Sequence, residues 1–111
     1  MSDVTNIKTI TNQLLYPVTV RNGENTQQTF TVNSSSGWNG DLWIPWVVSA
    51  RDMWKSISLV WPTNKIYIFQ HDNHIMYSWN NDFNQSGVLG GNSGIRGEKA
   101  LVIESDSNIH M

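Results

Sequence analysis

The sequence predicts an all-β fold, an antiparallel two-sheet β-sandwich of about seven to nine short strands. Apolar and polar residues alternate over several short segments, as in Ser56–Trp61 and His74–Trp79. Turn residues separate these segments at nearly regular spacing, and no amphipathic helix stands out. A small open β-barrel is the alternative, because its strand pattern is similar. The 111 residues favour one domain, spanning residues 1–111.

The first strands are predicted from alternation and from one turn signal. Val4–Ile10 has mixed faces, so we expect an edge strand or a partly ordered arm. Gln13–Val20 alternates more clearly, although Pro17 needs a position without a ladder hydrogen bond. The Asn-Gly pair at 22–23 predicts a hairpin that returns as the strand Gln27–Val32.

The stretch that follows is rich in tryptophan and harder to interpret. Its composition predicts a loop that begins at Asn33 and continues through Asp41. Leu42–Ser49 then has the pattern of a strand that is apolar on both faces and covered on both sides. Pro45 conflicts with a central strand, so we expect a bulge or a bend there.

The second half of the chain predicts a meander of three strands, preceded by a short helical turn or loop at Ala50–Lys55. A long polar and glycine-rich stretch then covers Asn80–Arg96, and a short strand around Ser86–Leu89 is possible within it. The expected strands of this half are Ser56–Trp61, Lys65–Gln70, His74–Trp79, Lys99–Glu104 and, weakly paired at an edge, Asn108–His110.

Composition excludes several classes of partner. The chain has no cysteine, and its seven basic residues are scattered singly, so neither a thiolate metal site nor nucleic-acid binding is expected. The N-terminus does not have the pattern of a secretory signal, and no apolar run could span a bilayer. We therefore expect a protein that is cytoplasmic or is released without a classical signal peptide.

The polar residues are mostly Asn, Ser and Thr, and only 14% of the chain is charged. Such surfaces form hydrogen bonds well with neutral partners, of which sugars are the obvious example, although the same residues also form turns. Composition therefore favours a carbohydrate or glycoconjugate as the ligand.

Periodicity divides five of the six tryptophans into two groups, and the sixth, Trp43, belongs to the two-faced strand predicted over Leu42–Ser49. Trp46, Trp61 and Trp79 occupy alternating positions, so we expect them in the core. Trp38 lies between glycine and asparagine outside any alternation, and Trp54 is similarly ambiguous. An exposed indole could stack on a sugar, anchor at a membrane interface, or simply fold over its own loop.

The sequence thus predicts a ligand site in two loops, where an indole stacks on a sugar ring and amide or carboxylate groups bind its hydroxyls. The candidate residues are Trp38, Asn39, Asp41, Trp54, Asn80, Asn81 and Asp82.

No metal, cofactor or catalytic centre is predicted. His71, Asp72 and His74 could approach a divalent metal, but a solvated hairpin tip is the simpler interpretation. The Asn and Asp side chains near residue 80 lack the spacing of a calcium loop. The carboxylates have no local pairing, and no Gly-x-Ser-x-Gly elbow is present, so an enzyme is not expected.

We therefore expect a non-enzymatic, lectin-like carbohydrate-binding module. Because single sugar sites usually bind weakly, a homo-oligomer is expected to supply avidity, with Leu42–Val48 as a possible interface. A membrane-lipid-binding or pore-forming module is the first alternative. A structural or protein-interaction domain is the second.

Overall fold

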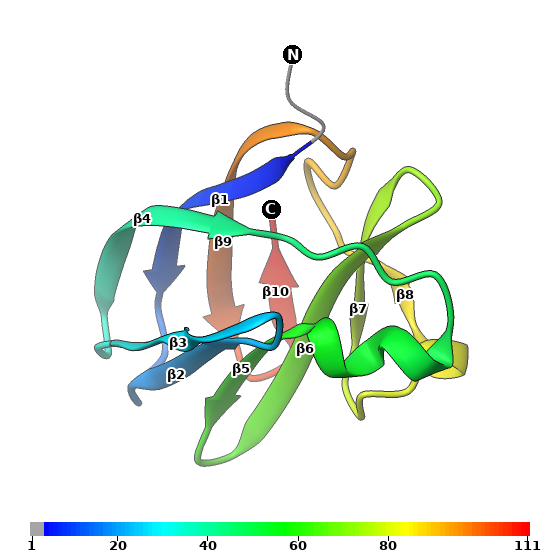
Figure 1. Cartoon of the computed structure of the whole chain (residues 1–111). Coiled ribbons are helices and arrows are strands. Elements are labelled where there is room, and N and C mark those ends of the chain that lie inside the picture. The colour runs from blue at the N-terminus through cyan, green and yellow to red at the C-terminus, as the bar shows by residue number, and fades with distance from the viewer. Residues whose placement is uncertain (1–3) are drawn as a thin grey trace.

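The computed structural model describes residues 4–111 as two packed β-sheets that do not close into a barrel (Figure 1). The predicted β-sandwich is thus confirmed. The four-stranded sheet has the order β10 (Asn108–His110), β9 (Gly97–Ser105), β1 (Thr5–Asn12) and β4 (Ser36–Trp43). The six-stranded sheet has the order β3 (Asn25–Val32), β2 (Val18–Asn22), β5 (Ile57–Trp61), β6 (Asn64–His71), β7 (His74–Ser78) and β8 (Gly87–Val88).

Two short 3-10 helices complete the fold: η1 (Ala50–Lys55) and η2 (Phe83–Gln85). Both are too short to be stable alone, so tertiary contacts must hold them. Met53 of η1 and Phe83 of η2 pack on the fully buried Phe69 of β6, together with Val47. Within residues 4–111, no helix combines the length and apolar character needed to cross a bilayer.

The main core lies between the two sheets and follows from the alternation in the sequence. Ile7, Ile10 and Leu42 from the four-stranded sheet and Leu59 and Ile68 from the six-stranded sheet have no exposed surface. Fully burying a side chain of this size stabilises the fold by about 1.5–3 kcal/mol. In the four-stranded sheet these positions alternate with outward-facing residues such as Lys8, Thr11 and Asp41. In β6, Ile68 is followed by the buried Phe69, so this strand is covered on both faces.

The expectation for the first strand was wrong. β1 is an inner strand: it pairs with β4 antiparallel on one side and with β9 parallel on the other. Its mixed alternation arises because the register shifts between Ile7 and Thr9 in both pairings, so the strand changes which residues face inward at a bulge. Among the strands of residues 4–111, β1 and β9 pair in parallel, and the other strand pairs are antiparallel.

Most of the predicted pairings are confirmed. β2 and β3 form the hairpin at residues 22–25, and β5, β6 and β7 form the three-strand meander. The short strand expected near Ser86–Leu89 is β8, and β10 pairs at the edge with β9. The predicted strand Gln13–Val20 starts too early, because the buried Asn12 amide donates to the Tyr16 and Val32 carbonyls and fixes a turn before β2.

The tryptophan-rich stretch is also different from its prediction. Residues 36–41, expected to be a loop, form most of β4, and the strand predicted over Leu42–Ser49 ends at Trp43. From Ile44 to Val47 the chain leaves the four-stranded sheet and attaches to β6. Pro45 thus marks the predicted departure from regular pairing, and it lies in this crossing segment.

Candidate functional site

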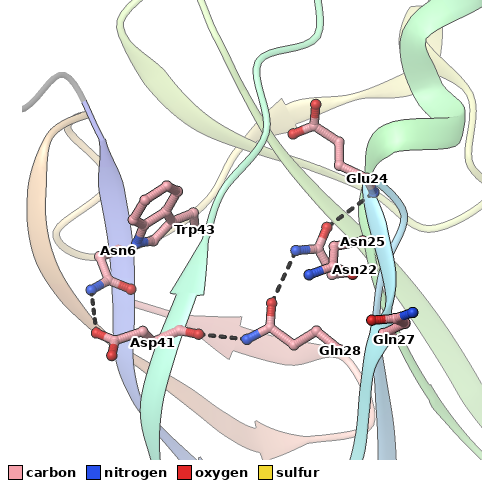
Figure 2. Close-up of a pocket in the computed structure, with 8 residues that line it drawn as sticks. All are labelled: Asn6, Asn22, Glu24, Asn25, Gln27, Gln28, Asp41 and Trp43. Atoms are coloured by element: carbon pink, nitrogen blue, oxygen red, sulfur yellow. Dashed lines mark hydrogen bonds between the residues drawn. The ribbon is translucent and has the colours of Figure 1, made fainter.

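An open groove of about 970 Å³ lies where the edge strands β3 and β4 diverge (Figure 2). One side comes from β1 and β4, and the other from the β2–β3 hairpin. Its lining combines five amide side chains, two carboxylates and one indole: Asn6, Asn22, Asn25, Gln27, Gln28, Glu24, Asp41 and Trp43. We call this the amide groove.

The sequence positions the two sides of the groove by simple alternation. On β4, Asp41 and Trp43 flank the fully buried Leu42, so both side chains leave the core face of the strand. On β3, Gln28 shares a side with the half-buried Phe30 and the buried Val32. The inward position of Gln28 directs its amide across the gap between the sheets.

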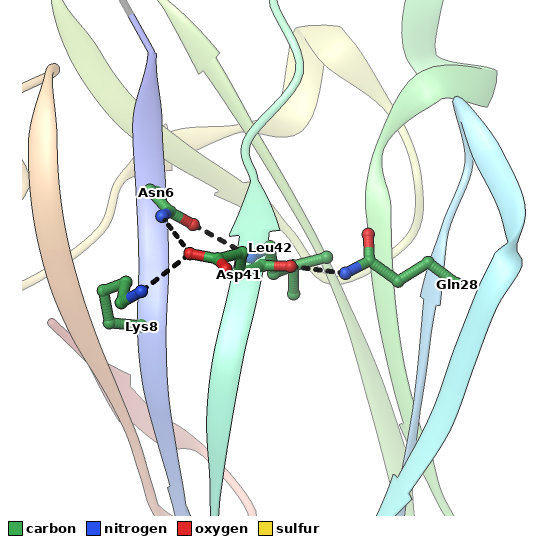
Figure 3. A network of polar contacts seen from close by, with 5 residues as sticks. All are labelled: Asn6, Lys8, Gln28, Asp41 and Leu42. Carbon is green, nitrogen blue, oxygen red and sulfur yellow. Dashed lines mark hydrogen bonds and ion pairs between the residues drawn. The ribbon is translucent and has the colours of Figure 1, made fainter.

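A chain of hydrogen bonds crosses the groove and fixes the amide orientations. Asn22 Nδ2 donates to Gln28 Oε1 at 3.0 Å, and Gln28 Nε2 in turn donates to the main-chain oxygen of Asp41. Asn6 Nδ2 donates to Asp41 Oδ1 at 2.8 Å, while Asn6 Oδ1 accepts from the Leu42 amide at 2.9 Å (Figure 3). Because each amide already has partners, its remaining polar atoms point in defined directions.

Asp41 is the charged group of this network. Lys8 Nζ lies 2.7 Å from Asp41 Oδ1, and this hydrogen bond, followed by the one from Asn6, lowers the pKa of the Asp41 carboxyl. The same contact raises the pKa of Lys8. Asp41 is therefore a carboxylate at neutral pH, and its ion pair with Lys8 is lost as the pH falls through the lowered pKa of Asp41 or rises through the raised pKa of Lys8.

Several polar groups of the groove remain free for a ligand. Among residues 4–111, Asp41 Oδ2 has no hydrogen-bond partner, and neither do the side-chain amides of Asn25 and Gln27. Together they offer an ionised acceptor on one side and amide donors and acceptors on the other. This is a suitable set for a ligand that carries several hydroxyl groups.

Trp43 supplies the apolar surface of the groove. Its side chain is 61% exposed although it follows the buried Leu42 directly. The backbone beyond it is held firmly: Ile44 N donates to Thr5 O at 2.9 Å, and the Gln70 amide donates to Ile44 O at 2.6 Å. The exposed indole is thus carried by main chain that is attached to both sheets.

A second hollow of about 280 Å³ adjoins the groove, and Glu24 and Trp43 line both. Its other walls include Pro45, Trp46, Lys55 and Gln70, and we call it the tryptophan hollow. Trp46 is 41% exposed there, so the prediction that it belongs to the core was wrong. The reason is that alternation does not continue beyond Trp43, where the chain leaves the sheet.

The other two tryptophans that were predicted to lie in the core, Trp61 and Trp79, do contact it. Trp61 is buried, and its Nε1 donates to Asp106 Oδ1 at 2.7 Å. Trp79 is half-buried and packs against the core, with its ring edge-to-face to Tyr77 at 5.8 Å between centroids.

Trp38 does not line the groove. Its ring stacks on Phe30 of β3 with centroids 4.4 Å apart and planes 14° from parallel, and it packs against the core. The ring also lies next to Gly40, where an added Cβ would be 2.5 Å from the indole. Trp38 therefore joins the two edge strands, and the glycine two residues later leaves room for its ring. Its neighbour Asn39 is exposed on β4, opposite Thr9 of β1, and does not line the groove either.

Trp54 is 63% exposed on η1, outside the lining of both cavities. Lys55 Nζ lies 5.7 Å from the centroid of its ring, within the range of a cation–π contact. The η1 main chain packs closely on the β2–β3 turn: a Cβ at Gly23 would lie 2.2 Å from Trp54 O. This close approach explains the need for glycine in the turn that carries Glu24 and Asn25.

The residues predicted near position 80 form a self-contained turn before η2. Asn80 Nδ2 donates to Gln85 Oε1 at 2.7 Å, Asn81 has a positive φ of 57°, and Asp82 accepts from the Asn84 amide. None of the three lines the groove. Asn and Asp serve here as turn and capping residues, so the structure does not bring them together with Asp41.

The histidines of the β6–β7 turn are also used locally. His71 Nδ1 is 2.7 Å from Val47 O, and His74 Nδ1 is 2.9 Å from Asp72 O. Asp72 and Asn73 both have positive φ, as a tight hairpin requires. Within residues 4–111, no group of three or more His, Asp or Glu side chains is arranged to hold a metal ion.

Of the predicted site residues, only Asp41 belongs to the groove. Sequence reasoning missed Asn6 and Gln28, because their partners on β4 lie 35 and 13 residues away in the sequence. It also missed Asn22, which bonds to Gln28 across the hairpin, and Trp43, which it assigned to a strand covered on both sides. A usable signal was present in the hairpin, where residues 22–28 contain five amide or acidic side chains that a tight turn alone does not need.

No family model, curated protein or solved structure matches this chain. The chain is a β-sandwich with an amide-lined groove at one open edge, and its function is inferred from the chemistry of that groove.

Proposed function

We propose that the protein is a non-enzymatic carbohydrate-binding module whose ligand lies in the amide groove. The observation that carries the proposal is the exposed Trp43 ring beside Asp41 and fixed amide side chains. An indole provides a flat surface for the apolar face of a sugar ring, and carboxylate and amide groups match its hydroxyls. The hydrogen-bond network holds these groups in place before the ligand arrives, which lowers the entropy cost of binding.

The charges of the groove favour neutral or amine-bearing sugars over acidic ones. Its lining contains two acidic residues, Glu24 and Asp41, and no basic residue. Lys8 approaches Asp41 Oδ1 and compensates part of that charge. A uronate or sulfated sugar would place a negative charge against this surface, which costs binding energy. Because one such site binds weakly, we also propose that several copies act together.

The Asp41→Asn variant tests the proposal. In a glycan array, we expect the wild-type protein to bind neutral glycans and Asp41→Asn to bind them roughly tenfold or more weakly, because a charged acceptor is lost. Asp72→Asn is the matched control: it changes the net charge equally at an exposed turn, and it should bind like the wild type. Absence of binding to every glycan, or equal binding by Asp41→Asn, would refute the proposal.

Binding to membrane lipid is a second candidate, and the surface that favours it overlaps the tryptophan hollow at Trp46 and Lys55. Trp46, Val48 and Trp54 are 41%, 74% and 63% exposed, and Arg51 and Lys55 lie on the same short segment. Exposed indoles beside basic residues are typical of membrane-interface contacts.

Co-sedimentation with phosphatidylcholine vesicles, with and without phosphatidylserine, tests the lipid candidate. If it is right, the wild type should sediment with the vesicles and Trp54→Ala should stay largely in the supernatant, because Trp54 is the most exposed of the indoles. Trp43→Ala is a suitable control. Equal sedimentation of the wild type and Trp54→Ala would exclude this role for the surface.

A further inference from the structure

Trp43 is the shared wall of two adjoining cavities, and this arrangement bears on the size of the ligand. Trp43 lines both the amide groove and the tryptophan hollow, with Glu24 as the second shared residue. At about 970 Å³, the groove is at the upper end of the range for ligand sites, and the hollow extends the concave surface further. A single sugar ring would leave most of this surface in water.

The hollow contains an aromatic surface of its own. Trp46 lines it and is 41% exposed, and the buried Pro45 lies between the two tryptophans in the chain. The polar groups there are Glu24, Lys55 and Gln70. The hollow therefore also places an indole beside polar side chains, and it differs from the groove in having a basic residue, Lys55.

The backbone between the two indoles is fixed rather than loop-like. Gln70 N donates to Pro45 O at 2.9 Å, and Val47 N donates to Gln70 O at 3.0 Å, so both sides of Trp46 are bonded to β6. The Gln70 side chain is buried, donates to Ile44 O and accepts from Thr5 Oγ1 at 2.8 Å. The main-chain positions of Trp43 and Trp46 are thus fixed by contacts with both sheets, as a preorganised pair of subsites requires.

We propose that the ligand is a linear oligosaccharide that occupies both cavities, with one sugar unit on Trp43 and a further unit on Trp46. This inference rests on the proposed function, since it assigns a second subsite to the same site. Asp41 and the amides bind the first unit, and Trp46 acts only on units beyond it. The chain length of the ligand should therefore determine its affinity.

Calorimetric titration with oligomers of glucose, mannose and N-acetylglucosamine, from one to six units, tests the inference. For the series that binds, we expect the affinity to rise with oligomer length and then to level off. The rise should exceed the statistical gain that comes from offering more identical sugar units to one site. Trp46→Ala should bind the monosaccharide like the wild type but lose the gain on lengthening, about tenfold or more. Trp54 is also an exposed indole and lies on the neighbouring η1, so Trp54→Ala is the control and should keep the full gain in affinity.

The two proposals fail in different ways. Binding that is sensitive to Asp41→Asn but independent of oligomer length, or a length gain that survives in Trp46→Ala, overturns the second subsite alone. No binding to these oligomers or to any glycan on the array overturns both. A Trp46→Ala protein with an unchanged circular dichroism spectrum and unfolding midpoint excludes misfolding as the cause of any loss.

Discussion

Replacing Trp43 with alanine should weaken glycan binding by about 30-fold or more and leave the fold intact. Truncating a tryptophan at the centre of a binding site typically costs about 2 kcal/mol or more, which corresponds to this factor. Because Trp43 is 61% exposed and belongs to neither apolar cluster of the core, stability should change little. Titration calorimetry with the glycan selected on the array measures the first effect, and urea unfolding measures the second.

Trp54→Ala is the control for this variant. The two indoles are almost equally exposed, at 61% and 63%, but only Trp43 lines the groove. A purely non-specific contribution of surface tryptophan would weaken binding equally in both variants. That result, or full binding by Trp43→Ala, would show that the groove is not the sugar site.

Phe69→Ala should lower the free energy of unfolding by about 3–5 kcal/mol, the usual cost of removing a buried phenylalanine ring. Phe69 has no exposed surface, and Val47, Met53 and Phe83 pack around it. The resulting cavity would loosen η1 and the segment after Trp46, which both depend on this ring. Urea denaturation, monitored by tryptophan fluorescence, measures the change in the free energy of unfolding.

Val60→Ala on the adjacent strand β5 is the comparison for this experiment. Val60 is 44% exposed, so its truncation should cost about 1 kcal/mol or less. If both variants unfolded with the free energy of the wild type, the Phe69 cluster would not be a stabilising part of the fold.

The fold was predictable where local pattern and tertiary structure agree. In the β5–β6–β7 meander, short alternating runs and polar turns lead directly to the observed pairing. The Asn-Gly pair likewise predicted the β2–β3 hairpin. These elements contact their sequence neighbours, so the information needed to place them is local.

Prediction failed where a partner distant in sequence decides the conformation. Residues 36–41 have the composition of a loop, yet they form a strand because β1 supplies their hydrogen bonds. Trp38 stacks on Phe30, which belongs to the edge strand of the other sheet, and the hydrophobic spacing along the chain does not predict this contact. The site was only partly predictable for the same reason: Asn6 and Asp41, whose side chains meet, are 35 residues apart.

The parallel pairing of β1 with β9 has a consequence for the order in which the molecule can be assembled. Each strand of the six-stranded sheet pairs with strands that are closer to it in the sequence than β9 is to β1. One edge of β1, in contrast, pairs with residues 97–103. During synthesis β1 can pair with β4 first, but its other edge stays open until residues 97–103 are made, and the slow step of folding is expected to be this long-range closure. Asn6 is positioned by the other edge of β1, through its bonds to Asp41 and Leu42 of β4, so the groove can form before β9 is added to the sheet.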